Sequence, residues 1–536
     1  MNNVTRGSVN RWRSLVFLCI SLLVISLDNT VVNVALPSIA KQLGGSDSDL
    51  QWIVAAYILV FAAMLLTMGA LGDRIGRKRV LQFGLLWFGA GSVFAALSPS
   101  TGMLILSRAF LGVGGAMIMP ATLSLITATF LDQKERFQAI AIWGAMFGVG
   151  SALGPLVGGL LLQVFDWKAV FLINLPVIAI ALIGGAFTIT ESRDTNVRPF
   201  DIPGVILSIV GLFALVYGII QAGITSWTDQ HALLAFGTAA VLLGLFVFWE
   251  SHTPHAMLPA ALFKNRTFSA ANAALVLVMF AMYGSIFFLS QFLQSVQGYS
   301  ALAAGIRLLP MAVLVTIGSI LSARLVGRLG LKVTVGGTIL LAAVGLFFLS
   351  RVATADAPYM IIVLALIVFT IGLGLAMPPA TAAVMSSVPI NKAGVGSAMN
   401  DTTRQLGAAL GVVVLGSIMN SVYLSQIARL RYLPQLMHLP AQVLNATSLG
   451  VQEAHVAAQS IIDPHIAQLV TDASNAAFVS GMAEAMLVGA VILVVASVLS
   501  FTLLPVTVRN SDDNLNMPGT TGDSLVKDEK SEVLTP

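Results

Sequence analysis

The first residue of chemical interest is an aspartate inside a long apolar run. Asp28 lies in LDNTVVNVALP (residues 27–37), and no other charged residue occurs between Arg13 and Lys41. A helix that begins near Leu15 carries Asp28 about 20 Å along its axis, close to the middle of a hydrocarbon layer about 30 Å thick. A carboxylate there costs at least about 2.5 kcal/mol and normally faces a cavity on a proton or ion path. Asp28 is therefore predicted to load and release a proton or cation; the alternative is a protonated Asp28 that only bonds a neighbouring helix.

A basic residue interrupts the fourth apolar run. Arg108 lies in LILSRAFLGVGGAMIMP (residues 104–120), where an unpaired guanidinium would be very costly, so it must face water or a carboxylate. Asp28 is a plausible partner. Such a pair favours the ionised form of Asp28, and its loss favours protonation, which would link proton binding to conformation. A purely structural ion pair is the alternative.

Two more carboxylates lie in the last two apolar runs. Asp401 and Arg404, in NDTTRQLG, are one helical turn apart and can pair. Asp401 is thus a second candidate for proton binding, with simple solvation near the membrane interface as the alternative. Glu484, about one turn into the last run, could attract cations at the exit, although interfacial placement explains it equally well.

A substrate cavity also needs apolar and aromatic walls. Aromatic faces attract organic cations, and methionine side chains adapt to ligands of varied shape. The candidates are Trp52, Tyr57, Trp143, Phe147, Met279, Met282 and Tyr283. Helix packing or anchoring at the membrane interface is the alternative for each of them.

The elements that position these residues are predicted to be membrane-spanning helices. The chain has 536 residues, of which 57% are hydrophobic and 10% charged, against about 25% charged in soluble proteins. Continuous helices satisfy their own backbone groups in lipid, so an all-α integral membrane protein is expected. Fourteen apolar runs can be distinguished, at 15–39, 51–71, 80–98, 102–125, 138–163, 168–190, 202–222, 233–250, 269–292, 302–325, 333–351, 358–381, 394–420 and 479–505.

The basic residues predict the orientation. With both termini in the cytoplasm, the inner loops and termini hold twenty of the 28 Lys and Arg residues and the outer loops hold five. This asymmetry follows the positive-inside rule, so the basic charge reports topology and implies no nucleic-acid partner. The segment 421–478 would then be an outer hairpin of short amphipathic helices, with histidines too widely spaced for a metal site. The tail 506–536 is predicted to be disordered.

Two glycine-containing motifs have specific spacing. The turn between the second and third runs reads GALGDRIGRKRV, in which glycines permit a tight turn and Asp73 can accept backbone N–H groups at a helix start, as a latch. Its residues are Gly69, Gly72, Asp73, Arg74, Gly76 and Arg77; a positive-inside anchor is the alternative. In the fifth run, Gly150, Gly154 and Gly158 share one helix face, beside Pro155 and Gly159, and allow close packing with a neighbour.

Four motifs in order resemble those of a transporter family. GxLxDRxGRKR resembles the signature of the major facilitator superfamily. LDNTVVNVALP resembles the start of its fourteen-helix drug:proton antiporters, of the multidrug and quaternary-ammonium efflux type. The runs around Arg108 and Gly154 resemble the arginine and antiporter motifs, although Leu111 stands where glutamine is common. RLVGRLGLK, at 324–332, resembles a degenerate second latch without its acidic residue.

The resemblance implies a fold, a domain division and a function. It implies two six-helix halves, at 15–190 and 269–505, with two inserted helices at 202–250 and a cytoplasmic N-terminus at 1–14. It implies a multi-pass protein of the bacterial cytoplasmic (inner) membrane, monomeric, without cofactor or metal. It also implies proton-coupled export of amphipathic, cationic drugs, antiseptics or dyes by alternating access, with Gly150–Gly159 favouring exchange over leak. The alternatives are an exporter of a specific metabolite, antibiotic or siderophore, and a membrane-embedded enzyme.

Overall fold

The chain forms an all-helical bundle in a computed structural model that describes residues 2–130, 132–193, 201–253, 263–387, 393–430 and 441–505. Every regular element in these ranges is helical. The elements are α1 (Asn2–Leu43), α2 (Asp47–Ile75), α3 (Arg77–Ala96), α4 (Thr101–Thr129), α5 (Gln133–Val164), α6 (Ala169–Leu172), α7 (Asn174–Thr188), α8 (Ile202–Ile224), α9 (Gln230–His252), α10 (Arg266–Gln291), the π-helix η2 (Phe292–Val296), α11 (Ala301–Val352), α12 (Tyr359–Ser386), α13 (Ala393–Leu430), α14 (Ala441–Thr447), α15 (Val451–Ala458) and α16 (Pro464–Leu503).

Short polar side chains begin many of these helices. At the start of α2, the Ser46 side chain accepts a hydrogen bond from the Asp49 backbone N–H, and the Asp49 carboxylate accepts one from the Ser46 N–H. This reciprocal capping box satisfies two N–H groups that a helix start otherwise leaves without a partner. The caps of α4, α5, α8, α9, α10, α11 and α16 are Ser100, Asp132, Asp201, Asp229, Asn265, Ser300 and Asp463.

The spans agree with the fourteen expected apolar runs. Thirteen helical segments in the described residues are long and apolar enough to cross a membrane. The remaining run, 138–163, lies within α5, which has 32 residues. The runs 302–325 and 333–351 are two helical segments joined within α11 by a sharp kink at Gly330, whose φ of +79° favours glycine. The prediction of an all-α, multi-pass membrane protein is confirmed.

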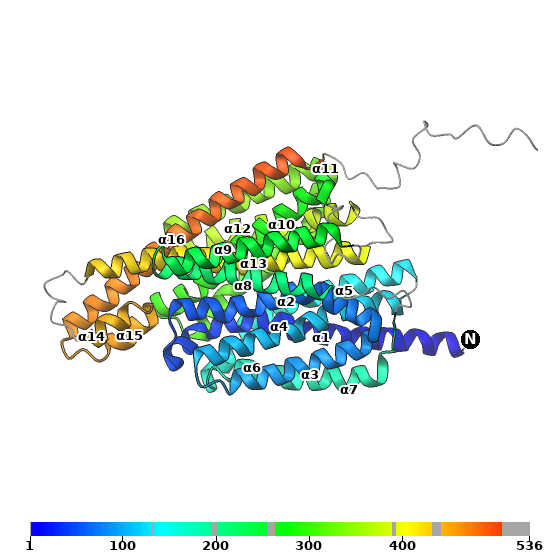
Figure 1. Cartoon of the computed structure of the whole chain (residues 1–536), viewed down its shortest axis with the longest axis horizontal. Coiled ribbons are helices and arrows are strands. Elements are labelled where there is room, and N and C mark those ends of the chain that lie inside the picture. Colours follow the sequence, from blue (N-terminus) through cyan, green and yellow to red (C-terminus); the bar gives the residue numbers. More distant parts are fainter. Residues whose placement is uncertain are drawn as a thin grey trace, which may run out of the picture.

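The helices gather in two groups, α1–α7 (the N half) and α10–α16 (the C half), which lie along each other in Figure 1. Between them α8 packs against α2 of one half and α13 of the other, with α9 outside it. Most of α9 is exposed, as expected of a helix whose apolar surface faces lipid.

One end of the bundle carries the small helices α14 and α15 (Figure 1), and we call it the hairpin end. We call the opposite end, with the turn between α2 and α3, the turn end. Within the expected hairpin segment 421–478, α13 continues to Leu430 and α16 already begins at Pro464, so the small helices take only its middle. The residues 431–440, with His438, and the tail 506–536 lie outside the described ranges.

Candidate functional site

A buried ion pair joins α1 to α4 inside the N half. The Asp28 Oδ2 atom lies 2.5 Å from Arg108 Nη1, and their exposed fractions are 0% and 1%. The sequence predicted this partnership because each charge would otherwise be stranded in an apolar helix. Removing one member of a buried pair typically costs about 3–5 kcal/mol, since the other charge stays buried without compensation.

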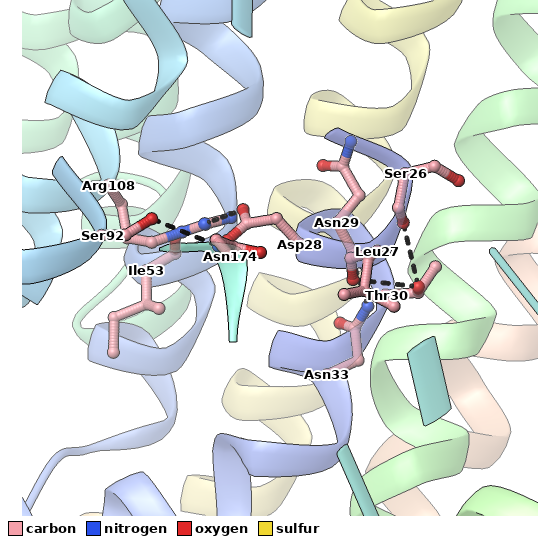
Figure 2. Close-up of polar contacts among 10 residues, drawn as sticks. All are labelled: Ser26, Leu27, Asp28, Asn29, Thr30, Asn33, Ile53, Ser92, Arg108 and Asn174. Carbon is pink, nitrogen blue, oxygen red and sulfur yellow. Dashed lines mark hydrogen bonds and ion pairs between the residues drawn. The ribbon is translucent and has the colours of Figure 1, made fainter. Parts of the chain in front are cut away.

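Neutral groups complete the surroundings of the pair. Arg108 Nε donates to the Ile53 carbonyl over 3.1 Å, and the guanidinium lies 4.3 Å from the centre of the Tyr57 ring. Asn174 Nδ2 donates to Asp28 Oδ1 over 3.0 Å and lies 3.2 Å from Ser92 Oγ. Figure 2 shows Asp28 pointing from α1 toward this group. The Asp28 carboxyl group is therefore held by two donors while sealed from solvent.

Asn174, at the start of α7, is a functional candidate that the sequence analysis missed. The expected helix 168–190 comprises α6 and α7, which are separated only by Ile173, itself in a helical backbone conformation. It places the Asn174 amide inside the bundle, with an exposed fraction of 0%. The available signal was an amide within an otherwise apolar run. Asn174 is placed to orient Asp28, because it binds the carboxylate oxygen that Arg108 leaves free.

A cavity of about 320 Å³ lies between the two halves, on the other side of α1. Thr30 and Asn33 of α1 line it, and Figure 2 shows Thr30 on the face of the helix away from Asp28. The remaining lining comes from both halves: Val34, Met119, Trp143, Pro155, Met279, Met282, Tyr283, Ile286, Leu308, Met311, Ala312, Val315, Thr316, Thr370, Met377, Asp401, Arg404 and Gln405.

The cavity wall combines adaptable apolar side chains with one pair of charges. Five of its residues are methionines, which fit irregular ligands. Asp401 Oδ1 and Arg404 Nη1 are 3.9 Å apart, a loose pair one helical turn apart on α13. A largely apolar pocket with a few polar groups is the usual form of a small-molecule site.

Some of the residues that were expected to line the cavity do so, and others lie elsewhere. Trp143, Met282 and Asp401 line it, as do Met279 and Tyr283. Tyr57 lies under Arg108, Trp52 stacks on Phe213 of α8, and Glu484 is exposed on α16; none of these three lines it. Asp28 lies on the face of α1 that is turned away from the cavity, so the expectation that it contacts substrate does not fit this conformation. The side chain of Phe147 lies outside the described part of the chain.

The halves contact each other toward the hairpin end. Ser290 Oγ of α10 and Gln294 Nε2 of η2 donate to the carbonyls of Asn33 and Val34 on α1, over 2.8 and 3.0 Å. In the same region the Asp47 N–H donates to the Leu449 carbonyl, between α14 and α15, over 3.0 Å. These bonds join α1 and α2 to the C half at this end of the bundle.

The glycines of α5 pack against two helices. Methyl groups at Gly150, Gly154 and Gly158 would collide with Ser26, Thr30 and Val31 of α1, the helix that carries Asp28. Gly159 faces the C half, where a methyl group would lie 2.5 Å from Leu302 Cα of α11. The shared glycine face therefore brings α5 into close contact with α1 and, through Gly159, with α11.

The turn between α2 and α3 is held by a carboxylate from the segment that follows α7. Gly76 has a φ of +117°, and Gly72 accepts its N–H. Beyond the end of α7, Glu191 accepts the N–H groups of Lys78 and Arg79, over 3.0 and 3.3 Å, at the start of α3. This is the helix-start role that the sequence analysis gave to Asp73, whose side chain lies outside the described part.

Other residues of this turn make supporting contacts. Arg77 donates from its backbone N–H to the Ser192 carbonyl over 2.9 Å and from Nη1 to Ser192 Oγ over 3.2 Å. Gly69 faces Pro120 of α4, and Arg74 is exposed. Sequence spacing could not reveal Glu191 and Ser192, because they lie more than 110 residues from the turn they hold.

Replacing Glu191 with Ala is expected to destabilise the turn by about 1 kcal/mol, because two N–H groups at the start of α3 lose their acceptor. Thermal unfolding of the purified protein would measure this loss. Asp356→Ala, which removes an exposed loop carboxylate, is the matched control. Equal melting temperatures for the two variants would show that Glu191 does not hold the turn.

Known proteins with similar sequences and folds agree with this helical architecture. Residues 18–412 match the family described as Major Facilitator Superfamily. The chain is 36% identical over 495 residues to "Multidrug efflux pump LfrA" of Mycolicibacterium smegmatis, covering 92% of this chain and 96% of the relative. It is 33% identical to "Methyl viologen resistance protein SmvA" of Salmonella typhimurium, covering 88% and 93%. The crystal structure of a bacterial homologue of the human lysosomal transporter Spinster shares the fold, with a TM-score of 0.64 at 20% identity and coverage of 92% and 96%.

Proposed function

This chain belongs to the Major Facilitator Superfamily, and from that premise we propose that it is a proton-coupled multidrug efflux antiporter. It exports amphipathic, cationic drugs, antiseptics or dyes by alternating access, and it works as a monomer in a bacterial cytoplasmic membrane with both termini inside. The family and fold are those of transporters rather than enzymes. The observation that carries the proposal is the methionine-rich cavity between the halves, which the Asp401–Arg404 pair also lines.

We assign the present conformation to the inward-facing state, in which Asp28 has released its proton. In the described part of the chain, the hydrogen bonds from α1 and α2 to the C half lie at the hairpin end, which is outside in the proposed topology. Arg108 and Asn174 hold Asp28 as a carboxylate in this state. Protonation of Asp28 would cancel its attraction to Arg108, so the pair would separate and α1 would be free to change its packing.

Asp28 then couples to the substrate through α1 rather than by direct contact. Its helix presents Thr30 and Asn33 to the cavity and packs on the glycines of α5. A change in the Asp28–Arg108 pair therefore moves the cavity wall and the α5 contact together. This differs from direct competition between a proton and a cation for one carboxylate.

Electrostatics supports exchange of a proton for a cation. Moving one positive charge outward against an interior-negative potential costs about 2.3 kcal/mol per 100 mV, and one entering proton cancels that electrical term. A dication would need two protons. Asp401, the carboxylate that lines the cavity, is the candidate for the second proton.

The proposed function is tested in inverted membrane vesicles energised with a proton gradient. Addition of a fluorescent organic cation such as ethidium is expected to give dye uptake together with proton release. The control is the same membrane without the protein. A panel of organic cations that gives neither signal would contradict the proposed substrate class and leave an exporter of another solute.

Replacing Asp401 with Asn is expected to weaken binding of organic cations by about tenfold or more, because Arg404 then leaves the cavity with a net positive charge. Neutral amphipathic ligands should lose much less affinity. Fluorescence titration of purified protein with an ethidium-like cation and with a neutral dye measures both. Asp472→Asn, on an exposed part of α16, is the control. An equal loss for both ligands would mean that Asp401 is structural.

A further inference from the structure

Two carboxylates face each other at the hairpin end, away from the Asp28 pair and the cavity. Asp47 begins α2 in the N half, and Glu453 lies in the first turn of α15 in the C half. Their exposed fractions are 3% and 8%. Asp47 Oδ1 and Glu453 Oε2 each lie 2.8 Å from the place a methyl group at Gly450 would occupy, so they are no further apart than twice that distance.

The pair has no counter-charge in the described part of the chain. No Lys, Arg or His there forms an ion pair with either carboxylate. The Asp47 Oδ2 and Glu453 Oε1 atoms are buried without a hydrogen-bond partner. Two like charges this close in a poorly solvated site cannot both be ionised at modest cost, so at least one carboxyl must hold a proton.

The remaining titratable groups around Glu453 do not neutralise it. α2 also presents Asp49, another acid, whose carboxylate is engaged by Ser46. α13 presents Tyr423, whose hydroxyl donates to the Thr447 carbonyl of α14 over 2.9 Å. On α15 itself, His455 is hydrogen-bonded to Asn475 of α16, and burial lowers its pKa, which favours the neutral imidazole.

The location makes this pair a contact between the halves. The Asp47 N–H donates to the carbonyl of Leu449, the residue directly before Gly450. The two carboxylates and this backbone hydrogen bond between the halves therefore lie at the same place. On its other side α15 is tied to the C half through Gln452–Ser295 and His455–Asn475. If α15 moves with the C half, opening of the hairpin end must separate Asp47 from Glu453 and admit water to both.

We propose that Asp47 and Glu453 form a second proton-binding site, which holds the hairpin end closed when it is protonated and releases it when both carboxylates are ionised. The site binds the proton itself. A metal ion is the less suitable ligand, because the described residues contain no third His, Cys, Asp or Glu placed to complete a metal site. Only the direction of the proton depends on the proposed antiport: protons from outside would promote return to the inward-facing state.

The pH dependence follows from the closed state. Burial, with the nearby Asp49 charge, raises the pKa of Glu453 from 4.5 to about 7. A group whose pKa is higher in the closed state than in a hydrated open state stabilises closure at low pH, and that stabilisation is lost as the pH rises through about 7. Each proton bound on closing changes the closed-to-open ratio by up to about tenfold per pH unit within that window.

The test measures the distance between α15 and the N half in the full-length protein in lipid nanodiscs. Spin labels are attached to Lys168→Cys and Ser460→Cys, two exposed positions, after Cys19→Ser removes the single native cysteine. Wild type should show one short distance at about pH 5 and a growing longer population toward about pH 8. Asp47→Asn combined with Glu453→Gln should stay short throughout, and the control Asp472→Asn should behave as wild type.

Several results would overturn the proposal. One is a wild-type distance between the labels that does not change with pH. Another is a double variant whose distance still changes with pH as in wild type. A third is closure restored near pH 8 by millimolar Mg²⁺ or Ca²⁺, which would make the site a cation site. If the double variant elutes as aggregate, Gly450→Ala replaces it. Its methyl group forces the ends of both carboxylate side chains to move apart, so the pH at which the longer distance appears should shift from that of wild type. This readout needs no transport, so loss of dye export with an intact distance response would contradict only the proposed function.

Discussion

Replacing Asp28 with Asn is expected to reduce cation-induced proton release to the background of empty membranes. Asparagine preserves the shape of the side chain and can still accept a hydrogen bond, but it cannot carry a proton between the two sides. It also leaves the Arg108 guanidinium, with an exposed fraction of 1%, without its counter-charge. The measurement follows dye uptake and proton release together in inverted vesicles.

The loss of coupling must be separated from a loss of stability. Unpairing Arg108 costs about 3–5 kcal/mol, so Asp28→Asn alone is expected to unfold at lower temperature. Adding Arg108→Gln removes both charges and should recover much of that stability while leaving proton release absent. A double variant that is stable and still releases protons on addition of the cation would show that Asp28 is structural.

Replacing Gly305 with Ala is expected to prevent closure of the hairpin end. A methyl group at Gly305 of α11 would overlap the Pro155 carbonyl of α5, and both atoms belong to helix backbones that cannot rotate away. Overpacking of this kind costs about 1–3 kcal/mol, which corresponds to a shift of roughly 5–150-fold away from the closed state. Dye export should fall by a similar factor, because the pump cannot return to the inward-facing state.

The matched control is Gly244→Ala on α9, where an added methyl group meets open space. It should export dye as wild type does. The conformational effect is measured independently of transport with the spin labels at positions 168 and 460, which should report the longer distance in Gly305→Ala at low pH. Wild-type transport and distance in Gly305→Ala would mean that the α5–α11 contact is not required for closure.

The helical elements and part of the chemistry could be predicted from the amino-acid sequence. Hydropathy and length are local properties of the chain, so the number and approximate limits of the membrane-spanning helices could be predicted from them. The Asp28–Arg108 pairing could also be anticipated, because hydrocarbon leaves a buried charge few alternatives other than an opposite charge. The spacing of Gly150, Gly154 and Gly158 similarly indicated one close-packed helix face.

Which face of each helix packs against which neighbour became known only from the folded structure. Asp28 and Thr30 are two residues apart, yet one is sealed against Arg108 and the other lines the cavity, because they point to opposite sides of α1. Glu191 at the α2–α3 turn depends on a contact across more than 110 residues, and the Asp47–Glu453 pair joins the two halves of the chain. Contacts between residues so far apart in the sequence cannot be predicted from a local pattern, because they form only when the helices pack together.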